Sequence, residues 1–323
     1  MKRILHLPLR ILSILIALVY VLGFGKATGE EFDVRDPRAC KLNFTVLSDV
    51  HVETNNFTRY RIISHSLQNV PKNKSGNDAV VFLGDSTMNS QYLENAIFHG
   101  TAALLLKNEK IISVLGNHDA GNSEGDYEKI MKRWYRFTDA FFGYDLAQPY
   151  YYDVIDGFYF IVLGSELNRV YECVISEAQF AWFEQVLSLA AESGKPCFVF
   201  NHFPLNCMTD ENLQHTDRLT NILRDYAAEH DLFYFCGHYH TPLSRGASFR
   251  EDYGFPQINA PSLSRMGGED GMQIDDRSGE GIVVELYADH LLVRGRNFYE
   301  SKWKYDAPLT LCERTYPLKH PLS

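Results

Sequence analysis

Five short apolar runs along the chain each stop abruptly at a small or polar residue. The runs are FTVLS, AVVFL, IISVL, CFVF and LFYFC. They are rich in Val, Ile, Phe and Leu, which is typical of strands buried on both faces of a parallel sheet. Segments with helical periodicity alternate with them, at 58–70, 91–107, 125–142, 176–194 and 212–230. This alternation predicts an α/β fold.

Two further regions alternate apolar and polar residues with a period of two. The segment YYYDVIDGFYFIVLGS predicts two strands around the turn Asp156-Gly157, and GIVVELYADHLLVRGRNF predicts a hairpin around Ala288-Asp289. Between them, residues 244–280 are rich in Gly, Arg, Asp and Ser, and predict long loops around a strand at 256–259. Because no internal repeat or Pro-rich linker interrupts the pattern, we expect a single domain over residues 28–323.

Composition and charge point to an enzyme rather than a nucleic-acid-binding protein. The chain has 323 residues, of which 45% are hydrophobic, which is enough for a large core. The first 27 residues contain four basic groups and no acid, so the remainder carries 27 basic against 41 acidic residues, a net charge of −14. A body this acidic is a poor partner for a nucleic-acid duplex.

The N-terminal segment is typical of a targeting sequence. Basic residues precede an apolar run from Ile11 to Phe24, and the small residues Gly25 and Ala27 follow it. This pattern favours a secretory signal that is cut after Ala27. An uncleaved membrane anchor is the alternative, because the run can be extended to Ile4. In either case we expect an extracytoplasmic protein, secreted or anchored at the cell surface.

The six cysteines leave their redox state open. Cys197 and Cys236 fall within predicted buried strands, where a thiol behaves as a small hydrophobic group. Two pairs, Cys173 with Cys207 and Cys40 with Cys312, are candidate disulfides if the protein is exported, and free thiols otherwise.

The polar ends of the five apolar runs carry side chains that can bind metal ions. The motifs are Asp-Val-His, Gly-Asp, Gly-Asn-His-Asp, Asn-His and Gly-His-Tyr-His, and their candidate residues are Asp49, His51, Asp85, Asn117, His118, Asp119, His202, His238 and His240. Taken singly, each motif is weak, because a Gly-Asp or a lone His at a strand end is often structural. Their order, each directly after a strand, is a strong indication, since an open α/β sheet binds ligands at the carboxyl ends of its strands.

This order of motifs resembles that of the calcineurin-like metallophosphoesterase family, over residues 44 to 242. The resemblance implies a two-sheet α/β/β/α sandwich with flanking helices and two metal ions at the sheet edge. It assigns one ion to Asp49, His51, Asp85 and His240, and the other to Asp85, Asn117, His202 and His238. Asp85 would then bridge both ions.

The donor chemistry agrees with that division. Carboxylate and amide oxygens together with imidazoles suit Mn, Fe or Zn, in divalent or trivalent form, rather than Cu(I). Such ions lie about 3.5–4 Å apart and turn a bridging water into hydroxide near neutral pH, which would attack phosphorus. The sequence has no Gly-x-Ser-x-Gly motif that would supply a serine nucleophile instead.

His118 and Asp119 are the candidate catalytic residues that do not bind metal. We expect His118 to face the leaving-group oxygen and donate a proton, and Asp119 to orient the His118 ring and raise its pKa. The alternative for both is a hydrogen bond within a turn.

Departures from the family pattern and the loops bear on the substrate. Met88 stands where many members carry an acidic residue and purple acid phosphatases a tyrosine, and the arginine typical of the serine/threonine phosphatases is also absent.

The candidate substrate-binding residues are Arg169, His215, Tyr239 and Arg265. We expect a small phosphate ester as substrate, with diesters slightly favoured over monoesters. A metal-bound but inactive binding protein is the alternative from another class.

Overall fold

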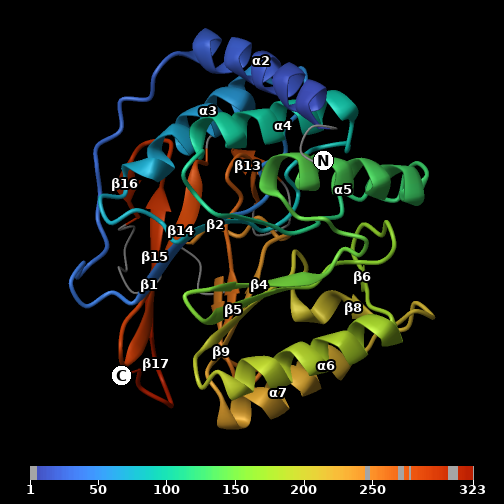
Figure 1. Ribbon diagram of the computed structural model, residues 1–323, viewed down its shortest axis with the longest axis vertical. Helices are drawn as coiled ribbons and strands as arrows, with labels where there is room; N and C mark the ends of the chain where they lie inside the picture. The colour runs from blue at the N-terminus through green and yellow to red at the C-terminus, as the bar shows by residue number, and fades with distance from the viewer. Residues whose placement is uncertain (1–5, 244–247, 268–272, 276–277, 305–311, 323) are drawn as a thin grey trace.

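Two β-sheets packed face to face form the centre of the molecule, and helices cover both outer faces (Figure 1). The computed structural model describes residues 6–243, 248–267, 273–275, 278–304 and 312–322. The four layers are therefore helix, sheet, sheet and helix, and the predicted α/β/β/α sandwich is confirmed.

The first sheet combines a parallel half with an antiparallel half. In spatial order β16-β15-β14-β1-β2-β3, with β17 paired to β15, its strands are Lys302–Trp303, His290–Asn297, Glu280–Leu286, Leu42–Leu47, Ala79–Phe82 and Ile111–Ser113, and β17 is Glu313–Pro317. Strands β1, β2 and β3 are parallel, whereas β14 runs antiparallel to β1. The C-terminal hairpin thus completes the sheet that the N-terminal βαβαβ unit begins.

The second sheet is mainly parallel. In spatial order β10-β11-β9-β7-β5-β4, its strands are Phe249–Arg250, Gln257–Asn259, Leu232–Cys236, Cys197–Phe200, Phe158–Val162 and Tyr151–Ile155. Two small two-stranded ribbons lie apart from it: β6 (Cys173–Val174) with β8 (Met208–Thr209), and β12 (Met266–Gly267) with β13 (Gln273–Asp275).

Helices are divided between the two outer faces (Figure 1). On the side of the first sheet lie α2 (Leu7–Phe24), α3 (Phe57–Asn69), α4 (Tyr92–Leu105) and α5 (Tyr127–Phe142), and on the side of the second lie α6 (Glu177–Glu192) and α7 (Arg218–Glu229). Short 3-10 turns occur at Val70–Lys72 and Leu205–Cys207. The side chains of Asn56, Asp126 and Ser176 cap α3, α5 and α6, because each accepts a backbone N–H of the first turn.

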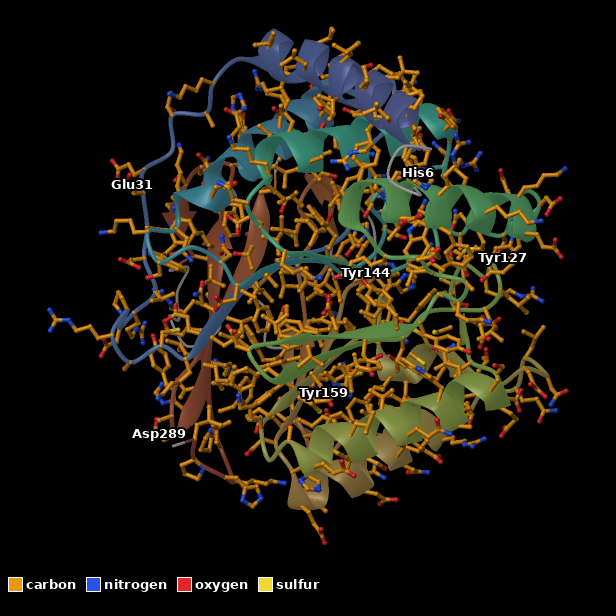
Figure 2. The ribbon with its side chains drawn as sticks, viewed as in Figure 1. His6, Glu31, Tyr127, Tyr144, Tyr159 and Asp289 are labelled. Atoms are coloured by element: carbon orange, nitrogen blue, oxygen red, sulfur yellow. The ribbon has the colours of Figure 1, made fainter. Side chains whose placement is uncertain are left out.

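The core between the sheets is built from aromatic side chains, and Figure 2 shows side chains filling this space. Phe44 of the first sheet lies at its centre, fully buried. Its ring makes edge-on contacts with four phenylalanines of the second sheet, Phe160, Phe198, Phe200 and Phe235, at centroid distances of 5.0–6.1 Å. Edge-to-face packing of this kind fixes the distance between the layers.

Most predicted elements are present, and one helix is shorter than predicted. The strands around Asp156-Gly157 and the hairpin around Ala288-Asp289 are confirmed. The helix predicted over 212–230 begins only at Arg218, because residues 211–213 form a turn and His215 then bridges back to Thr209. Of the loop region predicted at 244–280, residues 244–247, 268–272 and 276–277 lie outside the described part of the chain.

Neither candidate disulfide is formed. Cys173 and Cys207 are both free thiols: the first lies against the Asn201 side chain, and the second lies 3.3 Å from the Tyr239 hydroxyl. Cys40 is also a free thiol and donates to the carbonyl of Leu42. Cys40, Cys173 and Cys207 are therefore free thiols, which is the alternative that the sequence left open.

Candidate metal centre

Loops that follow five parallel strands meet at one edge of the two sheets. Asp49, Asp85 and Asn117 follow β1, β2 and β3 of the first sheet, whereas His202 follows β7 and both His238 and His240 follow β9 of the second. The structure brings these residues and His51 together, although they are spread over 192 positions of sequence. Both layers of the sandwich thus contribute donor groups to one site.

Four side chains form a first cluster of donor atoms. Asp49, His51, Asp85 and His240 each offer a ligand atom, and these atoms all lie within 4.8 Å of one another. The Nε2 atoms of His51 and His240 are 3.1 Å apart. Asp49 Oδ1 lies 3.0 Å from His240 Nε2 and 3.8 Å from His51 Nε2. This spacing suits atoms that share one cation at their centre.

A second cluster lies beside the first and shares Asp85 with it. His202 Nε2 is 3.3 Å from Asp85 Oδ2 and 3.1 Å from Asn117 Oδ1. His238 Nδ1 lies 3.0 Å from the same Asn117 oxygen. Asp85 Oδ2 is also 3.8 Å from His51 Nε2, so this single oxygen faces both clusters.

Neighbouring groups fix the orientation of these side chains. The amide of Asn117 donates to Asn122 Oδ1, which leaves its oxygen facing the site. The ring of His202 is held through Nδ1 by the carbonyl of Leu83. Ser48 donates to Asp49 Oδ2, which leaves Oδ1 facing the first cluster. Partners of this kind set the tautomer and angle of metal ligands.

Five of the seven candidate ligand residues have left-handed backbone conformations. The φ angles of Asp49, His51, Asp85, His238 and His240 are 51°, 47°, 50°, 72° and 51°. Positive φ is uncommon outside glycine, although Asp, Asn and His adopt it more readily than other residues. Backbone held in sparsely populated conformations is typical of functional sites. The sharp turn at each strand end directs these side chains into the site.

Two glycines of the motifs provide room for donor groups of other loops. A Cβ atom at Gly116 would overlap Asp85 Oδ1 and the Asp85 backbone nitrogen. A Cβ atom at Gly237 would overlap the hydroxyl of Ser48 and come within 2.8 Å of Asp49 Oδ2. Since each glycine lies one residue before a candidate ligand, the motif spacing reflects close packing between loops as well as donor chemistry.

Two buried polar atoms of the first cluster lack hydrogen-bond partners within the described part of the chain. They are Asp49 Oδ1 and His51 Nδ1. A buried carboxylate oxygen that lacks a hydrogen bond lowers the stability of the fold. The position of Asp49 Oδ1, which faces the Nε2 atoms of His51 and His240, therefore fits a bound cation. The all-oxygen-and-nitrogen donor set agrees with Mn, Fe or Zn.

Electrostatics also favour cation binding. Burial lowers the pKa of His51 well below its usual value, so the ring is neutral and its lone pair is available. Burial acts to raise the pKa of Asp85, but the imidazoles of His202 and His118 hold it well below the usual range. Burial acts to lower the pKa of His202, whereas Asp85 raises it, to about 9. A cation that binds here therefore replaces a proton on His202.

His118 lies at the rim of the site, and its partner differs from the predicted one. Its backbone N–H donates to Asp85 Oδ1, and its Nδ1 lies 2.7 Å from the carbonyl of Met88. Asp119 instead accepts hydrogen bonds from the backbone of Gly116, Ser86 and Thr87 and from the Thr87 hydroxyl. The prediction that Asp119 orients the His118 ring is therefore wrong. The Met88 carbonyl does so, and Asp119 fixes the loop that carries Asp85.

The comparison with known proteins agrees with the geometry. The sequence profile of calcineurin-like phosphoesterases matches residues 42–242. The chain belongs to this family. The resemblance inferred from the motifs is thereby confirmed, and with it the class of metal-dependent hydrolases of phosphate esters.

Solved structures resemble this phosphoesterase at low sequence identity, and the first of the two shares its fold. A dimetal phosphatase from Danio rerio is 16% identical, and the match covers 86% of this chain and 99% of that one, with a TM-score of 0.55. A protein serine/threonine phosphatase from Saccharomyces cerevisiae is 12% identical over 97% and 90% of the two chains, with a TM-score of only 0.39. No curated protein matches the chain.

A cavity of about 500 Å³ opens over the candidate metal centre of the phosphoesterase. Its lining comprises Asp85, Met88, Asn117, His118, Asn122, Val170, Tyr171, His238, Tyr239, His240, Arg265 and Met266. Two of the four predicted substrate-binding residues, Tyr239 and Arg265, are thus placed at the site. Arg169 is not among the lining residues, although its neighbours Val170 and Tyr171 are, and His215 pairs with Asp217 elsewhere. No sequence signal distinguished Tyr171 from other loop tyrosines.

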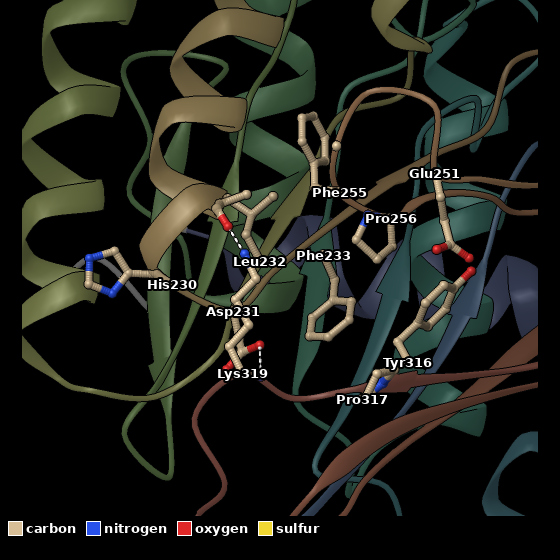
Figure 3. A pocket seen from close by; sticks show the side chains of 12 residues that line it. His230, Asp231, Leu232, Phe233, Glu251, Phe255, Pro256, Tyr316, Pro317 and Lys319 are labelled. Carbon is tan, nitrogen blue, oxygen red and sulfur yellow. Dashed lines mark hydrogen bonds between the residues drawn. The ribbon is translucent and has the colours of Figure 1, made fainter.

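A second cavity, of about 280 Å³, lies at the opposite end of β9 (Figure 3). Leu232 and Phe233 at the start of the strand line it, whereas His238 follows the strand's far end. Asp231 accepts the backbone N–H groups of Lys319 and His320 there, which holds the C-terminal segment against α7. None of the seven candidate ligands is among the described residues that line this cavity, so the candidate metal centre is the site with the chemistry of the family.

Proposed function

We propose that this phosphoesterase is an exported, dinuclear-metal enzyme that hydrolyses phosphodiesters. The observation that carries the proposal is the position of Asp85, whose Oδ2 faces His51 at 3.8 Å and His202 at 3.3 Å. One carboxylate shared by two donor clusters is the arrangement that holds a pair of metal ions. Residues 28–323 would form one catalytic domain, since β14 and β15 complete the sheet that β1 begins.

The two clusters would divide the ligands as the family resemblance implies. We assign Asp49, His51, Asp85 and His240 to one ion, and Asp85, Asn117, His202 and His238 to the other. Mn, Fe or Zn fits this donor set. When bound, the metal pair would polarise the phosphate ester and activate water for attack on phosphorus. The chain then has to position the ester and manage the proton of the leaving group.

His118 would supply the leaving-group proton. Because the Met88 carbonyl accepts the Nδ1 proton at 2.7 Å, Nε2 is the ring atom left to hold or release a proton towards the cavity. Nε2 lies 4.0 Å from Asp85 Oδ2, beside the shared carboxylate. General acid catalysis of this kind contributes about 10²- to 10⁴-fold in rate.

The cavity favours a diester over a monoester. Of the described residues that line it, Arg265 is the one with a permanently positive side chain, whereas Tyr171, Tyr239, Met88 and Met266 are largely apolar. The proposed ions would serve the charge of either ester, but a diester has a second organic group to accommodate. The largely apolar side chains of Tyr171, Tyr239, Met88 and Met266 would provide the surface for that group.

The test compares hydrolysis of bis-(p-nitrophenyl) phosphate and p-nitrophenyl phosphate by the full chain loaded with Mn²⁺, with and without a chelator. Faster diester cleavage that the chelator abolishes is the expected result. Cleavage of the monoester alone would replace the proposal with a phosphomonoesterase. Metal bound at two equivalents without turnover of either ester would instead make the protein a binding module.

The proposed export rests on the N-terminal helix. Helix α2, Leu7–Phe24, is long and apolar enough to cross a membrane, with a mean hydropathy of 2.3. A cleaved signal and a retained anchor both pass this criterion. Protease protection of the native protein in sealed cells would test export: a chain accessible from the outside is expected, and a chain protected until lysis would exclude it.

A further inference from the structure

The middle of helix α4 is buried on all sides, and α2 is the element that covers its outer side (Figure 1). Every residue from Glu94 to Ala102 is buried. A helix on the surface of a domain would instead present a polar stripe to water. Ser13 and Ala17 of α2 lie against Gly100 so closely that a Cβ atom there would overlap the Ser13 carbonyl. The helical layer on the first sheet is therefore complete only with α2 in place.

The segment that joins α2 to the rest of the chain is also held by specific contacts. His65 of α3 donates to the carbonyl of Phe24. Gln68 contacts two points of the link, since its amide group donates to the Gly25 carbonyl and its oxygen accepts the Ala27 N–H. Ala27, the residue before the predicted cleavage position, is only 5% exposed. These contacts build the N-terminal segment into the fold.

The outward face of α2 is apolar and uncovered. Its large side chains Leu7, Ile11, Leu12, Leu15, Leu18, Val19 and Leu22 are between 37% and 71% exposed. The face continues onto α3 through Phe57, which is 60% exposed and stacks on Tyr20. A continuous apolar surface of this kind marks an interaction site.

Charge indicates which surface would cover this face. No charged residue lies between Arg10 and Lys26, and these two together with Lys2 and Arg3 are the basic groups of the N-terminal 27 residues. The remainder of the chain carries a net charge of −14. Aliphatic residues flanked by cations match a bilayer with anionic headgroups. A second copy would place the same cations against each other.

We propose that α2 is neither removed nor inserted across the membrane, but stays packed on α4 and lies in the plane of a lipid bilayer. Its 18 residues span about 27 Å, slightly less than the roughly 30 Å hydrocarbon core. Crossing the bilayer would also remove the cover from Ala96, Gly100 and Tyr60. Membrane attachment of this kind is independent of the reaction proposed above, but it is the alternative to the export proposed there, which requires α2 to be a cleaved signal or a crossing anchor.

The first test measures flotation of the full chain with vesicles of neutral lipid and with vesicles containing anionic lipid. The chain should bind both, and the anionic vesicles more tightly. The double substitution Leu15→Glu and Val19→Glu should reduce binding roughly tenfold or more, with an unchanged melting temperature, because both side chains already face outward. Leu189→Glu on α6, 41% exposed on the far helical layer, is the matched control and should bind normally.

The second test locates the helix by intact mass and by depth. The membrane-bound protein should retain its N-terminal residues, and a tryptophan placed by Leu15→Trp should be quenched most by lipids brominated near the headgroups. Strongest quenching by bromines at the chain ends would show a crossing helix and overturn the proposal. So would a mature chain that begins at residue 28, or a vesicle-independent dimer that the Glu variants dissociate.

Discussion

At the scale of single residues, Asp85 connects all parts of the candidate centre. Its Oδ1 accepts the backbone N–H of His118, and its Oδ2 faces both donor clusters. The residue is 1% exposed and has a left-handed backbone, so the position of the carboxylate is fixed by its loop. One side chain therefore relates both proposed ions and the proposed acid.

Asp85→Asn should remove both metal ions and abolish turnover with little change in fold. The amide lacks the negative charge that two cations would share, but its shape preserves the hydrogen bond from His118. Metal content by mass spectrometry, hydrolysis of the diester and circular dichroism would check this. Asp289→Asn, on the exposed turn between β14 and β15, is the matched control and should change none of the three. Full activity of the Asp85 variant would disprove the proposed mechanism.

His118→Ala should retain both metal ions but lose about 10²- to 10⁴-fold in rate on esters with poor leaving groups. The loss should be much smaller for p-nitrophenyl esters, because that leaving group needs no proton. A series of aryl diesters of increasing leaving-group pKa would measure the difference. An equal loss across the series would exclude His118 as the acid.

Asp119→Ala should act through the loop that carries Asp85. Its carboxylate accepts hydrogen bonds from Gly116, Ser86 and Thr87, and each buried donor left without a partner costs about 1–3 kcal/mol. We expect a lower melting temperature and weaker metal binding, and a leaving-group dependence like that of the unchanged protein. Asp119→Asn retains an acceptor oxygen, so its melting temperature and metal affinity should lie between those of Asp119→Ala and of the unchanged protein. A leaving-group effect like that of His118→Ala would restore the orienting role.

Residue types and order were sufficient to predict that the seven candidate ligands lie together, because strand ends of parallel sheets converge on one edge. They were insufficient for Asp119, since adjacency in sequence suggested a contact with His118 that the turn does not allow. The roles of Met88, Asn122 and Ser48 depend on which backbone or side-chain atom faces the site, and a sequence pattern holds no such information.

At the scale of elements, the sharp turns at the strand ends require room for the neighbouring loops as well as a left-handed backbone. The loop after β3 passes so close to the loop after β2 that Gly116 has no room for a Cβ beside Asp85. Likewise, the loop after β9 passes against Ser48 at Gly237. At Gly237 the second sheet thus contacts the first, through the side chains of Ser48 and Asp49.

Gly116→Ala should weaken metal binding by about 10- to 100-fold, the usual effect of displacing a group that positions a ligand. The added methyl group would push Asp85 away from the shared position. Calorimetric titration with Mn²⁺ would measure the affinity. Gly23→Ala on α2 is the control, because no heavy atom lies within 4 Å of its added Cβ. Unchanged affinity in the Gly116 variant would mean that the loops can separate without cost.

Element predictions succeeded where the periodicity was long and failed where a tertiary contact was decisive. The βαβαβ unit and both hairpins followed from apolar patterning, since buried strands and amphipathic helices have distinct periods. The start of α7 was misplaced because the bridge from Thr209 to His215 competes with helix formation. Cysteine spacing could not tell that Cys173 would lie against Asn201 rather than bond to Cys207.

At the scale of the whole molecule, the centre joins the two layers of the sandwich. Asp49, Asp85 and Asn117 belong to the first sheet, whereas His202 and His238 belong to the second. The layers otherwise meet through the apolar core around Phe44. Ions held by both sets would therefore link the layers directly.

Metal should accordingly stabilise the folded chain. At a free metal concentration 100 times the dissociation constant, the expected gain is about 2.7 kcal/mol in the free energy of unfolding. Differential scanning calorimetry with Mn²⁺ and with a chelator would measure it. Hydrogen exchange should show the loops after β1 and β9 most protected by metal. The Asp85→Asn variant should not respond, and an equal gain in that variant would mean binding elsewhere.

Because both sheets contribute donor groups to the candidate centre, the order of synthesis along the chain matters. A ribosome that has released residues 1–120 has produced the donors of the first sheet, but the imidazoles of the second sheet emerge only with residues 202–240. The strand that pairs with β1 on its other side, β14, follows later still. A nascent chain therefore cannot assemble the hydrolytic centre early, and activity begins only when nearly the whole polypeptide has been made.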